Sequence, residues 1–215
     1  MASRVLLSPQ NQSLEEIAEF HALAREALVH YHDSSNPAYS VAFAGLTADE
    51  VAESLDTRIT ELELRSIFDV LASVEASLRI DFALRVSQRE KDPLSRDFRE
   101  VYRKNKSFIR LEEGILARWR GHHPGYASLI SELGLVLEFR HWLAHGRYWS
   151  ARLSRDYDYY NVSALAEAVT EVPSPPRCAH RAPRAASRRA PPTPNPRSLP
   201  DAASDCPRTQ RRTSR

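Results

Sequence analysis

Residues 64–86 read LRSIFDVLASVEASLRIDFALRV, and this stretch decides the fold class. Its apolar residues recur at three- and four-residue steps, which is the period of an α-helix, and no glycine or proline interrupts them. The pattern predicts a long amphipathic helix that packs against other helices. Its apolar stripe consists of Leu64, Ile67, Phe68, Leu71, Val74, Leu78, Phe82 and Val86, with Glu75 at the edge.

Two capping-box patterns lie upstream of this stretch. Thr47 with Glu50 begins a segment that has no glycine or proline before Pro93, and Ser13 with Glu16 begins an earlier helix that ends before residues 33–37. A segment of some forty residues would span roughly 60 Å at 1.5 Å per residue, which is long for a small domain. We therefore expect a bend within residues 56–60. The expected apolar face of the first helix is Leu14, Ile17, Phe20, Leu23, Ala24, Ala27, Leu28 and Tyr31.

Three further helices are predicted downstream. Asp92 and Pro93 begin a third helix, which ends at residues 123–125. A fourth runs from about Tyr126 to Gly146, and a last one from about Asn161 to residue 172. Because no stretch alternates apolar and polar residues as strands do, the sequence predicts an all-α, up-and-down bundle of four to five helices.

Composition divides the chain into three parts: a flexible arm at 1–12, a helical domain at 13–172 and a tail at 173–215. The tail holds ten prolines, ten arginines and two acidic residues, so we expect it to be disordered. With a total charge of +2, the tail's +8 leaves about −6 for the rest. The basic pI of 8.6 therefore belongs to the tail. The tail could be a basic arm that binds nucleic acid or the acidic domain, or it could be a solvated extension with no specific role. An out-of-frame read of GC-rich DNA would give the same composition.

Both cysteines, Cys178 and Cys206, fall in the tail, so the domain has no thiolate for a disulfide, a zinc site or a nucleophile. This distribution favours a reducing, cytoplasmic location. No apolar run reaches the roughly 18 residues that a membrane helix needs, and we expect no membrane association.

Residues 137–147, LEFRHWLAHGR, carry the candidate chemistry. Arg140 and His145 lie five positions apart near the end of a strongly apolar helix, and Gly146 follows as the expected helix-ending residue with positive φ. The spacing alone is a weak signal, because the 27 arginines and eight histidines give two accidental matches, Arg25 with His30 or His32 and Arg118 with His123. The local context distinguishes Arg140 and His145 from these.

This segment resembles the HEPN superfamily (higher eukaryotes and prokaryotes nucleotide-binding), whose members carry Arg-polar-x3-His in the last long helix of an all-α bundle. Glu75 resembles a glutamate seen in related toxin and phage-defence members. His141 stands where the family usually has asparagine. The family includes metal-independent endoribonucleases of phage-defence and toxin–antitoxin systems and also inactive binding members. The resemblance implies the first of these, acting as a homodimer that brings two motifs across one cleft. It also implies an RNA substrate, a possible antitoxin partner and no cofactor.

The chemistry of the side chains agrees with that class. His145 would transfer protons at neutral pH, and the planar guanidinium of Arg140 would hold the phosphate. Glu138 or Glu75 would orient either group, and His141 is a further catalytic candidate. Metal-independent cleavage needs a base for the 2′-hydroxyl and an acid for the leaving 5′-oxygen.

Other interpretations stay open. His141 and His145 share a helix face and could form a metal pair, although no third ligand is specified, and we expect no metal. Alternatively, His145 only caps the helix and Arg140 only pairs with an acid, in which case the chain is a non-catalytic binding module for a protein or nucleotide. Some residues could contact RNA bases or backbone, although such residues are more often core, dimer-contact or solvated residues. They are Trp142, Arg147 and Tyr148 near the motif and Arg99, Arg103, Lys104, Lys106 and Arg110 on the third helix.

Overall fold

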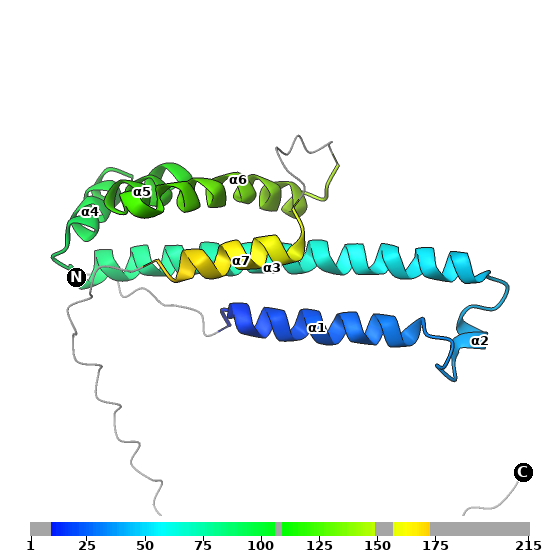
Figure 1. Cartoon of the computed structure of the whole chain (residues 1–215). Coiled ribbons are helices and arrows are strands. Elements are labelled where there is room, and N and C mark those ends of the chain that lie inside the picture. The colour runs from blue at the N-terminus through cyan, green and yellow to red at the C-terminus, as the bar shows by residue number, and fades with distance from the viewer. Residues whose placement is uncertain (1–9, 106–108, 149–156, 173–215) are drawn as a thin grey trace, which may run out of the picture. The chain divides into compact units, whose positions relative to one another are not determined.

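The computed structural model describes residues 10–105, 109–148 and 157–172. These residues form helices and no strand, so the predicted all-α fold is confirmed (Figure 1). The elements are α1 (Leu14–Tyr31), α2 (Tyr39–Ala42), α3 (Ala48–Gln88), α4 (Pro93–Asn105), the π-helix η1 (Leu111–Leu116), α5 (Ala117–His122), the 3-10 helix η2 (Pro124–Tyr126), α6 (Ala127–Ala144) and α7 (Tyr159–Thr170). The predicted tail, and residues 1–9 of the predicted arm, lie outside the described residues.

Both predicted capping boxes are confirmed. The Ser13 hydroxyl accepts from the Glu16 amide at 3.1 Å, and the Glu16 carboxylate accepts from the Ser13 amide at 2.8 Å. Thr47 and Glu50 repeat the arrangement at the start of α3. Each box satisfies backbone donors that the first turn of a helix leaves without partners, which fixes where α1 and α3 begin.

The expected bend at 56–60 is wrong, because α3 is one continuous helix of 41 residues. α1 packs along the N-terminal half of α3 and supports it. Successive contacts join Ser73 to Gln12, Ser66 to His21 and Ser54 to His32, so α1 runs antiparallel along α3. A helix with a neighbour along this length and no glycine or proline has no reason to break.

The expectation of one continuous third helix is also wrong. It is divided into α4, the π-helix η1 and α5, with residues 106–108 outside the described part. A Cβ added at Gly114 in η1 would lie 2.5 Å from Cγ2 of Ile109, so the chain approaches itself closely at this turn. Apolar periodicity alone does not reveal such a turn, because the apolar pattern of the sequence does not distinguish one wider, π-helical turn from an α-helical one.

The bundle consists of α1, α3, α6 and α7, and α4 and α5 close it at the C-terminal end of α3 (Figure 1). α6 runs antiparallel to α3, and α7 packs on both. Burial of apolar side chains from all of these helices is the main stabilising contribution. Fully buried members of the core include Leu71, Leu94, Phe98, Ile115, Leu133 and Val162.

The predicted inward face of α1 is wrong in part. Phe20 is 64% exposed and Leu23 67% exposed, whereas His21 is buried at 3%. His21 lies 3.0 Å through Nδ1 from the hydroxyl of Ser66, and its ring stacks on Tyr159 at 3.7 Å. A hydrogen bond and a ring partner thus place a histidine where an apolar residue was expected.

The last helix begins at Tyr159, two residues before the predicted Asn161, and Asp158 caps it by accepting from the Asn161 amide. None of the described helices is long and apolar enough to cross a membrane.

Candidate functional site

The C-terminal end of α6 carries the candidate segment, and its backbone ends as the sequence predicts. Gly146 has φ +77°, the Gly146 amide donates to the carbonyl of Leu143, and the Arg147 amide donates to the carbonyl of Trp142. These two hydrogen bonds form a Schellman motif, which requires positive φ at the glycine position. The motif turns the chain sharply after His145 and sets the direction of Arg147.

Arg140 faces α3 and is anchored there. Its Nη1 lies 2.8 Å from Oε2 of Glu75, and its guanidinium lies over the ring of Phe68 at 5.6 Å from the centroid. The other carboxylate oxygen of Glu75 accepts from Nε of Arg79 at 2.7 Å. Glu75 therefore holds two arginines, and the prediction that Glu75 could orient Arg140 agrees with this geometry. Arg140 remains 30% exposed.

His141 and His145 lie on a different side of α6. Both are exposed, and their rings are 4.2 Å apart and tilted by 59°. The backbone amide of His145 caps the helix by donating to the carbonyl of His141. Five residues correspond to about 140° around a helix, so the histidine pair points away from the α3 face on which Arg140 lies.

Glu138 is not a partner of Arg140. It is exposed and lines a cavity of about 500 Å³ between α6 and η1, together with Glu112, Glu113 and Arg120. Two residues on a helix are separated by about 200°, so Glu138 and Arg140 point in nearly opposite directions. The expectation that Glu138 could orient Arg140 is therefore wrong, and Glu75 takes that position.

The three residues named as weak nucleic-acid contacts have different surroundings. Trp142 is half-buried and stacks on Phe139 at 5.4 Å. Arg147 donates two hydrogen bonds to the carboxylate of Glu61, at 2.8 and 2.9 Å, which lowers the pKa of that carboxyl. Tyr148 is 83% exposed. Of the three, Trp142 belongs to the core and Arg147 to the contact with α3.

A groove of about 450 Å³ lies between α3 and the end of α6, which we name the α3/α6 groove. Phe68, whose ring Arg140 covers, lines this groove, and so does Ala144, the residue before His145. The groove therefore lies next to Arg140, whereas the histidine pair points away from α3. Its lining residues are Glu61, Leu64, Arg65, Phe68, Asp69, Leu143, Ala144 and Arg147.

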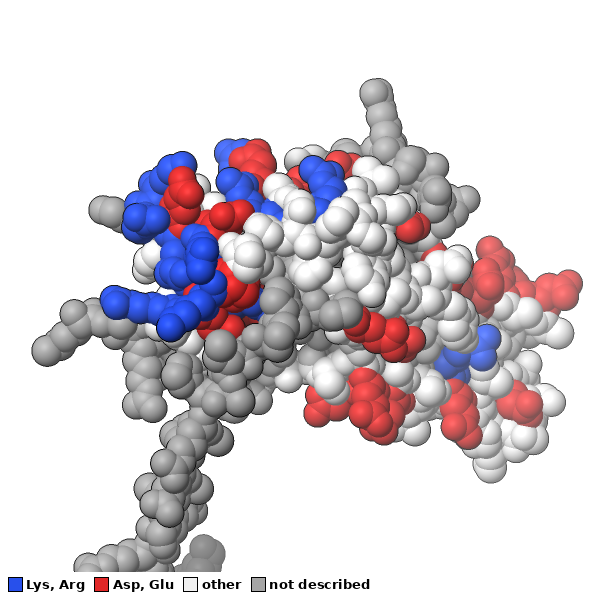
Figure 2. All heavy atoms as spheres, turned by 60° about the vertical axis from the view of Figure 1, so that its left-hand side comes forward, with Lys and Arg blue, Asp and Glu red and all other residues white. Residues whose placement is uncertain are grey.

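Charge is distributed unevenly along the bundle. Residues 10–75 contain thirteen acidic and three basic residues, whereas residues 76–126 contain seven acidic and twelve basic ones. Figure 2, in which the end with α4 and α5 is turned forward, shows most of the visible Lys and Arg gathered there among some Asp and Glu, whereas the charged residues visible elsewhere are mainly Asp and Glu. On α4 and just before it, Arg89, Lys91, Arg96 and Arg103 are exposed and form no ion pair with a described residue. This end therefore suits a polyanion.

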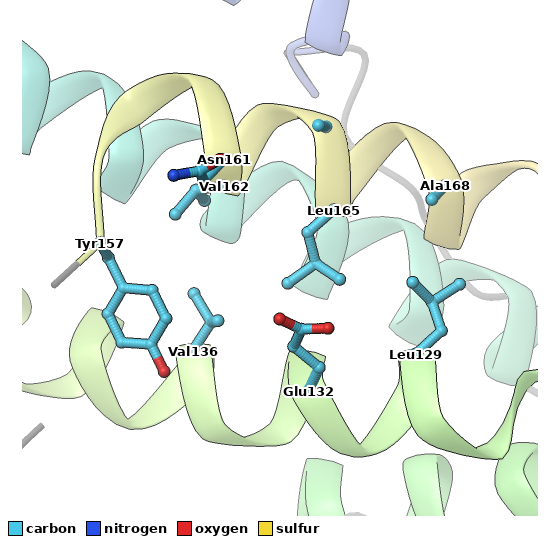
Figure 3. A pocket seen from close by; sticks show the side chains of 9 residues that line it. Leu129, Glu132, Val136, Tyr157, Asn161, Val162, Leu165 and Ala168 are labelled. Carbon is cyan, nitrogen blue, oxygen red and sulfur yellow. The ribbon is translucent and has the colours of Figure 1, made fainter. Parts of the chain in front are cut away.

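A further pocket of about 430 Å³ lies between α6 and α7 (Figure 3). Its lining is mainly apolar, with Glu132, Tyr157 and Asn161 as polar members. It contains none of the residues that the sequence marked as candidates.

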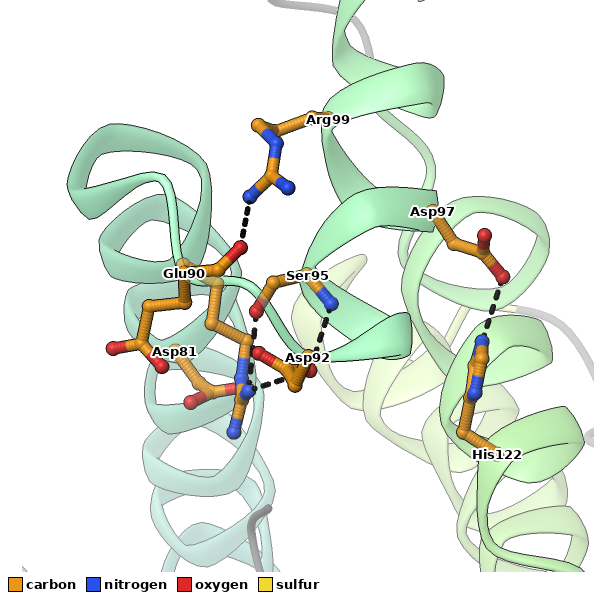
Figure 4. Close-up of polar contacts among 8 residues, drawn as sticks. Asp81, Glu90, Asp92, Ser95, Asp97, Arg99 and His122 are labelled. Atoms are coloured by element: carbon orange, nitrogen blue, oxygen red, sulfur yellow. Dashed lines mark hydrogen bonds and ion pairs between the residues drawn. The ribbon is translucent and has the colours of Figure 1, made fainter. Parts of the chain in front are cut away.

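Sequence reasoning missed a buried polar cluster around Arg85, where α3 turns into α4 (Figure 4). Arg85 is 0% exposed and pairs with Asp81 at 2.7 Å and with Asp92 at 3.3 Å, and it donates to the hydroxyl of Ser95. Arg99 donates to the Glu90 carbonyl at the edge of this cluster. The only signal was the i,i+4 spacing of Asp81 and Arg85 inside an apolar stripe, and such spacing is common on exposed faces.

The described residues include no group of three or more His, Cys, Asp or Glu side chains that could hold a metal ion. The chain matches no protein-family model, no curated protein and no solved structure. The resemblance to the HEPN superfamily therefore stays a prediction that rests on the residues of α6 and on Glu75.

Proposed function

We propose that this protein is a metal-independent endoribonuclease, with Arg140 and His145 as catalytic residues and His141 as a third candidate. The observation that carries the proposal is an anchored arginine followed, at the same helix end, by two exposed histidines. Glu75 and Phe68 hold Arg140 in one place. His141 and His145 are exposed to solvent.

The reaction follows from these groups. A histidine takes the proton of the 2′-hydroxyl, the 2′-oxygen bonds to phosphorus, and the bond from phosphorus to the 5′-oxygen breaks. A second proton donor gives a proton to the leaving 5′-oxygen. Arg140 stabilises the negative charge that accumulates on the phosphate oxygens. The products are a 2′,3′-cyclic phosphate and a 5′-hydroxyl, so no oxidant and no metal ion is consumed.

A homodimer is part of this proposal. Because Arg140 and His145 point about 140° apart around α6, one copy offers the arginine and the histidines on different sides. A second copy facing the first would place the arginine of one motif near the histidines of the other. The basic end formed by α4 and α5 supports a polyanionic substrate.

The biological setting we propose is cytoplasmic phage defence or a toxin–antitoxin system, with an antitoxin as a possible protein partner. This part rests on the family resemblance of the motif and Glu75. The acidic residues of the region 10–75 would suit a basic partner.

A non-catalytic binding module is the second candidate, and one observation favours it. The charge of Arg140 is already engaged by Glu75, and its side chain is part of the contact between α3 and α6. An arginine with this role stabilises the bundle whether or not the protein cleaves RNA.

One experiment separates the two candidates. The wild type is incubated with single-stranded and with structured RNA in EDTA, beside the variants Arg140→Ala and His145→Ala. The control is Arg58→Ala, which changes an exposed arginine of α3. The nuclease is supported if the wild type and Arg58→Ala cleave the RNA and neither Arg140→Ala nor His145→Ala does. RNA that stays intact with the wild type, with the dimer confirmed by light scattering, supports the binding module.

A further inference from the structure

Two residues of opposite charge line the α3/α6 groove and form no ion pair with each other. Arg65 is exposed and Asp69 half-buried, and they lie one turn apart on α3. Neither forms a hydrogen bond or an ion pair with any described residue, and Arg65 acts on Glu61 only through its charge, which lowers the pKa of that carboxyl. An acid placed before a base at this spacing pairs better than the reverse order found here. The groove therefore presents an acceptor and a donor group that are both available to a ligand.

The other lining residues define what kind of ligand fits. Leu64, Leu143 and Ala144 are apolar, and the remaining charged pair, Arg147 with Glu61, is already joined. Two arginines and two carboxylates cancel, so the groove has no net charge to attract a bare phosphate or a free cation. A volume of about 450 Å³ lies in the range of small-molecule sites. The lining suits a flat, neutral molecule with hydrogen-bond donors on one edge and acceptors on another.

Burial affects the carboxyl of Asp69 directly. It raises the pKa of this group, because the charged form loses hydration in the groove. Donors from a ligand would replace part of the lost hydration, so a ligand with two adjacent N–H donors gains most from this position.

We propose that the α3/α6 groove binds guanine, with Asp69 accepting from N1–H and the 2-amino group and Arg65 donating to O6 and N7. Arginine pairs well with these two acceptors. Adenine, uracil and cytosine all lack the adjacent pair of N–H donors that guanine presents.

The groove lies beside the candidate catalytic segment, and this link rests on the proposed function. Ala144 lines the groove and precedes His145, and Phe68 lines it beneath Arg140. A guanine of an RNA strand held here would place its neighbouring phosphate near Arg140. Guanine would then determine where the strand is cut.

Binding tests this inference without requiring cleavage. The full chain at about pH 8 is titrated in EDTA with guanosine 5′-monophosphate, adenosine 5′-monophosphate, uridine 5′-monophosphate and inorganic phosphate. The dissociation constants are measured by calorimetry. We expect guanosine 5′-monophosphate to bind at least about fivefold more tightly than the other two nucleotides, the lower end of what one bidentate contact gives. Asp69→Asn and Arg65→Ala should each abolish this preference. The matched controls Asp56→Asn and Arg58→Ala, on the same helix outside the groove, should retain it.

RNA oligomers that contain one guanine form the second arm. A preference seen with both the free nucleotide and the oligomer supports a nucleotide site, and one seen only with the oligomer supports recognition of RNA. Equal affinity for all three bases in both arms, or a preference that Asp69→Asn leaves unchanged, would overturn the inference. Guanine binding by a protein that cuts no RNA in EDTA would remove the nuclease proposal and leave the groove assignment standing.

Discussion

Nη1 of Arg140 on α6 lies 2.8 Å from Oε2 of Glu75 on α3, although the two residues are 65 positions apart in the chain. Glu75 also accepts from Arg79, and Arg79 donates to the carbonyl of Ile109 just before η1. The carboxylate of Glu75 therefore links α3 to α6 directly and, through Arg79, to the segment before η1. The same carboxylate fixes the guanidinium that we propose as the phosphate-binding group.

Glu75→Gln should remove the charge of this connection while preserving the shape of the side chain. We expect the free energy of unfolding to fall by about 1 kcal/mol, because the pair with Arg140 is partly exposed and solvent weakens it. Denaturant titration measures the change, and Glu53→Gln, an exposed residue of α3, is the control. A loss no larger than that of the control would show that the pair does not support the bundle.

Arg85→Ala should be the most destabilising single change among the arginines discussed. It would leave Asp81 and Asp92 with uncompensated charge in the buried corner of Figure 4, which costs about 3–5 kcal/mol. Arg96→Ala, an exposed arginine of α4, should change the free energy of unfolding by less than about 0.5 kcal/mol. Urea unfolding curves compare the two variants, and similar midpoints would contradict a structural role for the cluster.

Gly146→Ala tests the helix end that positions His145 and Arg147. Alanine at φ +77° is strained, so we expect a loss of about 1 kcal/mol and a weaker pair between Arg147 and Glu61. Gly134→Ala lies in the same helix, and its added Cβ meets nothing within 4 Å, so it should stabilise by about 0.5–1 kcal/mol. Thermal melting of both variants measures the difference. If the two substitutions shift the melting temperature in the same direction, the backbone account of this turn is incorrect.

His21 should make the stability depend on pH. Burial, with a smaller contribution from Arg25, lowers the pKa of this histidine in the folded chain below its usual value of about 6.5. Below about pH 6.5 the unfolded chain therefore binds a proton that the folded chain does not, and the free energy of unfolding falls as the pH drops towards the folded pKa.

Urea titrations at about pH 7.5 and 5.5 measure this effect. The loss of stability on acidification should be smaller in His21→Gln than in the wild type. His30→Gln, an exposed histidine of the same helix, should keep the wild-type dependence. An unchanged dependence in His21→Gln would mean that another group titrates.

The helices were predictable from the sequence because capping residues and apolar periodicity are local signals. Ser13, Thr47 and Gly146 each perform the predicted backbone role. What failed depends on contacts between distant segments. The continuity of α3 depends on the support of α1, the burial of His21 depends on Ser66 and Tyr159, and the corner at Arg85 depends on α4.

The candidate site shows the same division. The position of the segment at the end of α6 followed from local sequence, and Glu75, which we expected to be able to orient Arg140, pairs with it. The separation of Arg140 from the two histidines and the opposite orientation of Glu138 follow from the residue spacing on one helix. The α3/α6 groove became evident only when α3 was placed beside α6.

The most direct test of the central claim uses an RNA that the wild type cuts in EDTA and the same RNA with a single 2′-deoxy nucleotide at the cut position. We predict a 2′,3′-cyclic phosphate on the product of the first RNA, no cut at the modified position of the second, and no cut of either RNA at that position by His145→Ala. Cleavage at the 2′-deoxy position, or an unchanged rate in His145→Ala, would contradict attack by the 2′-hydroxyl at this site.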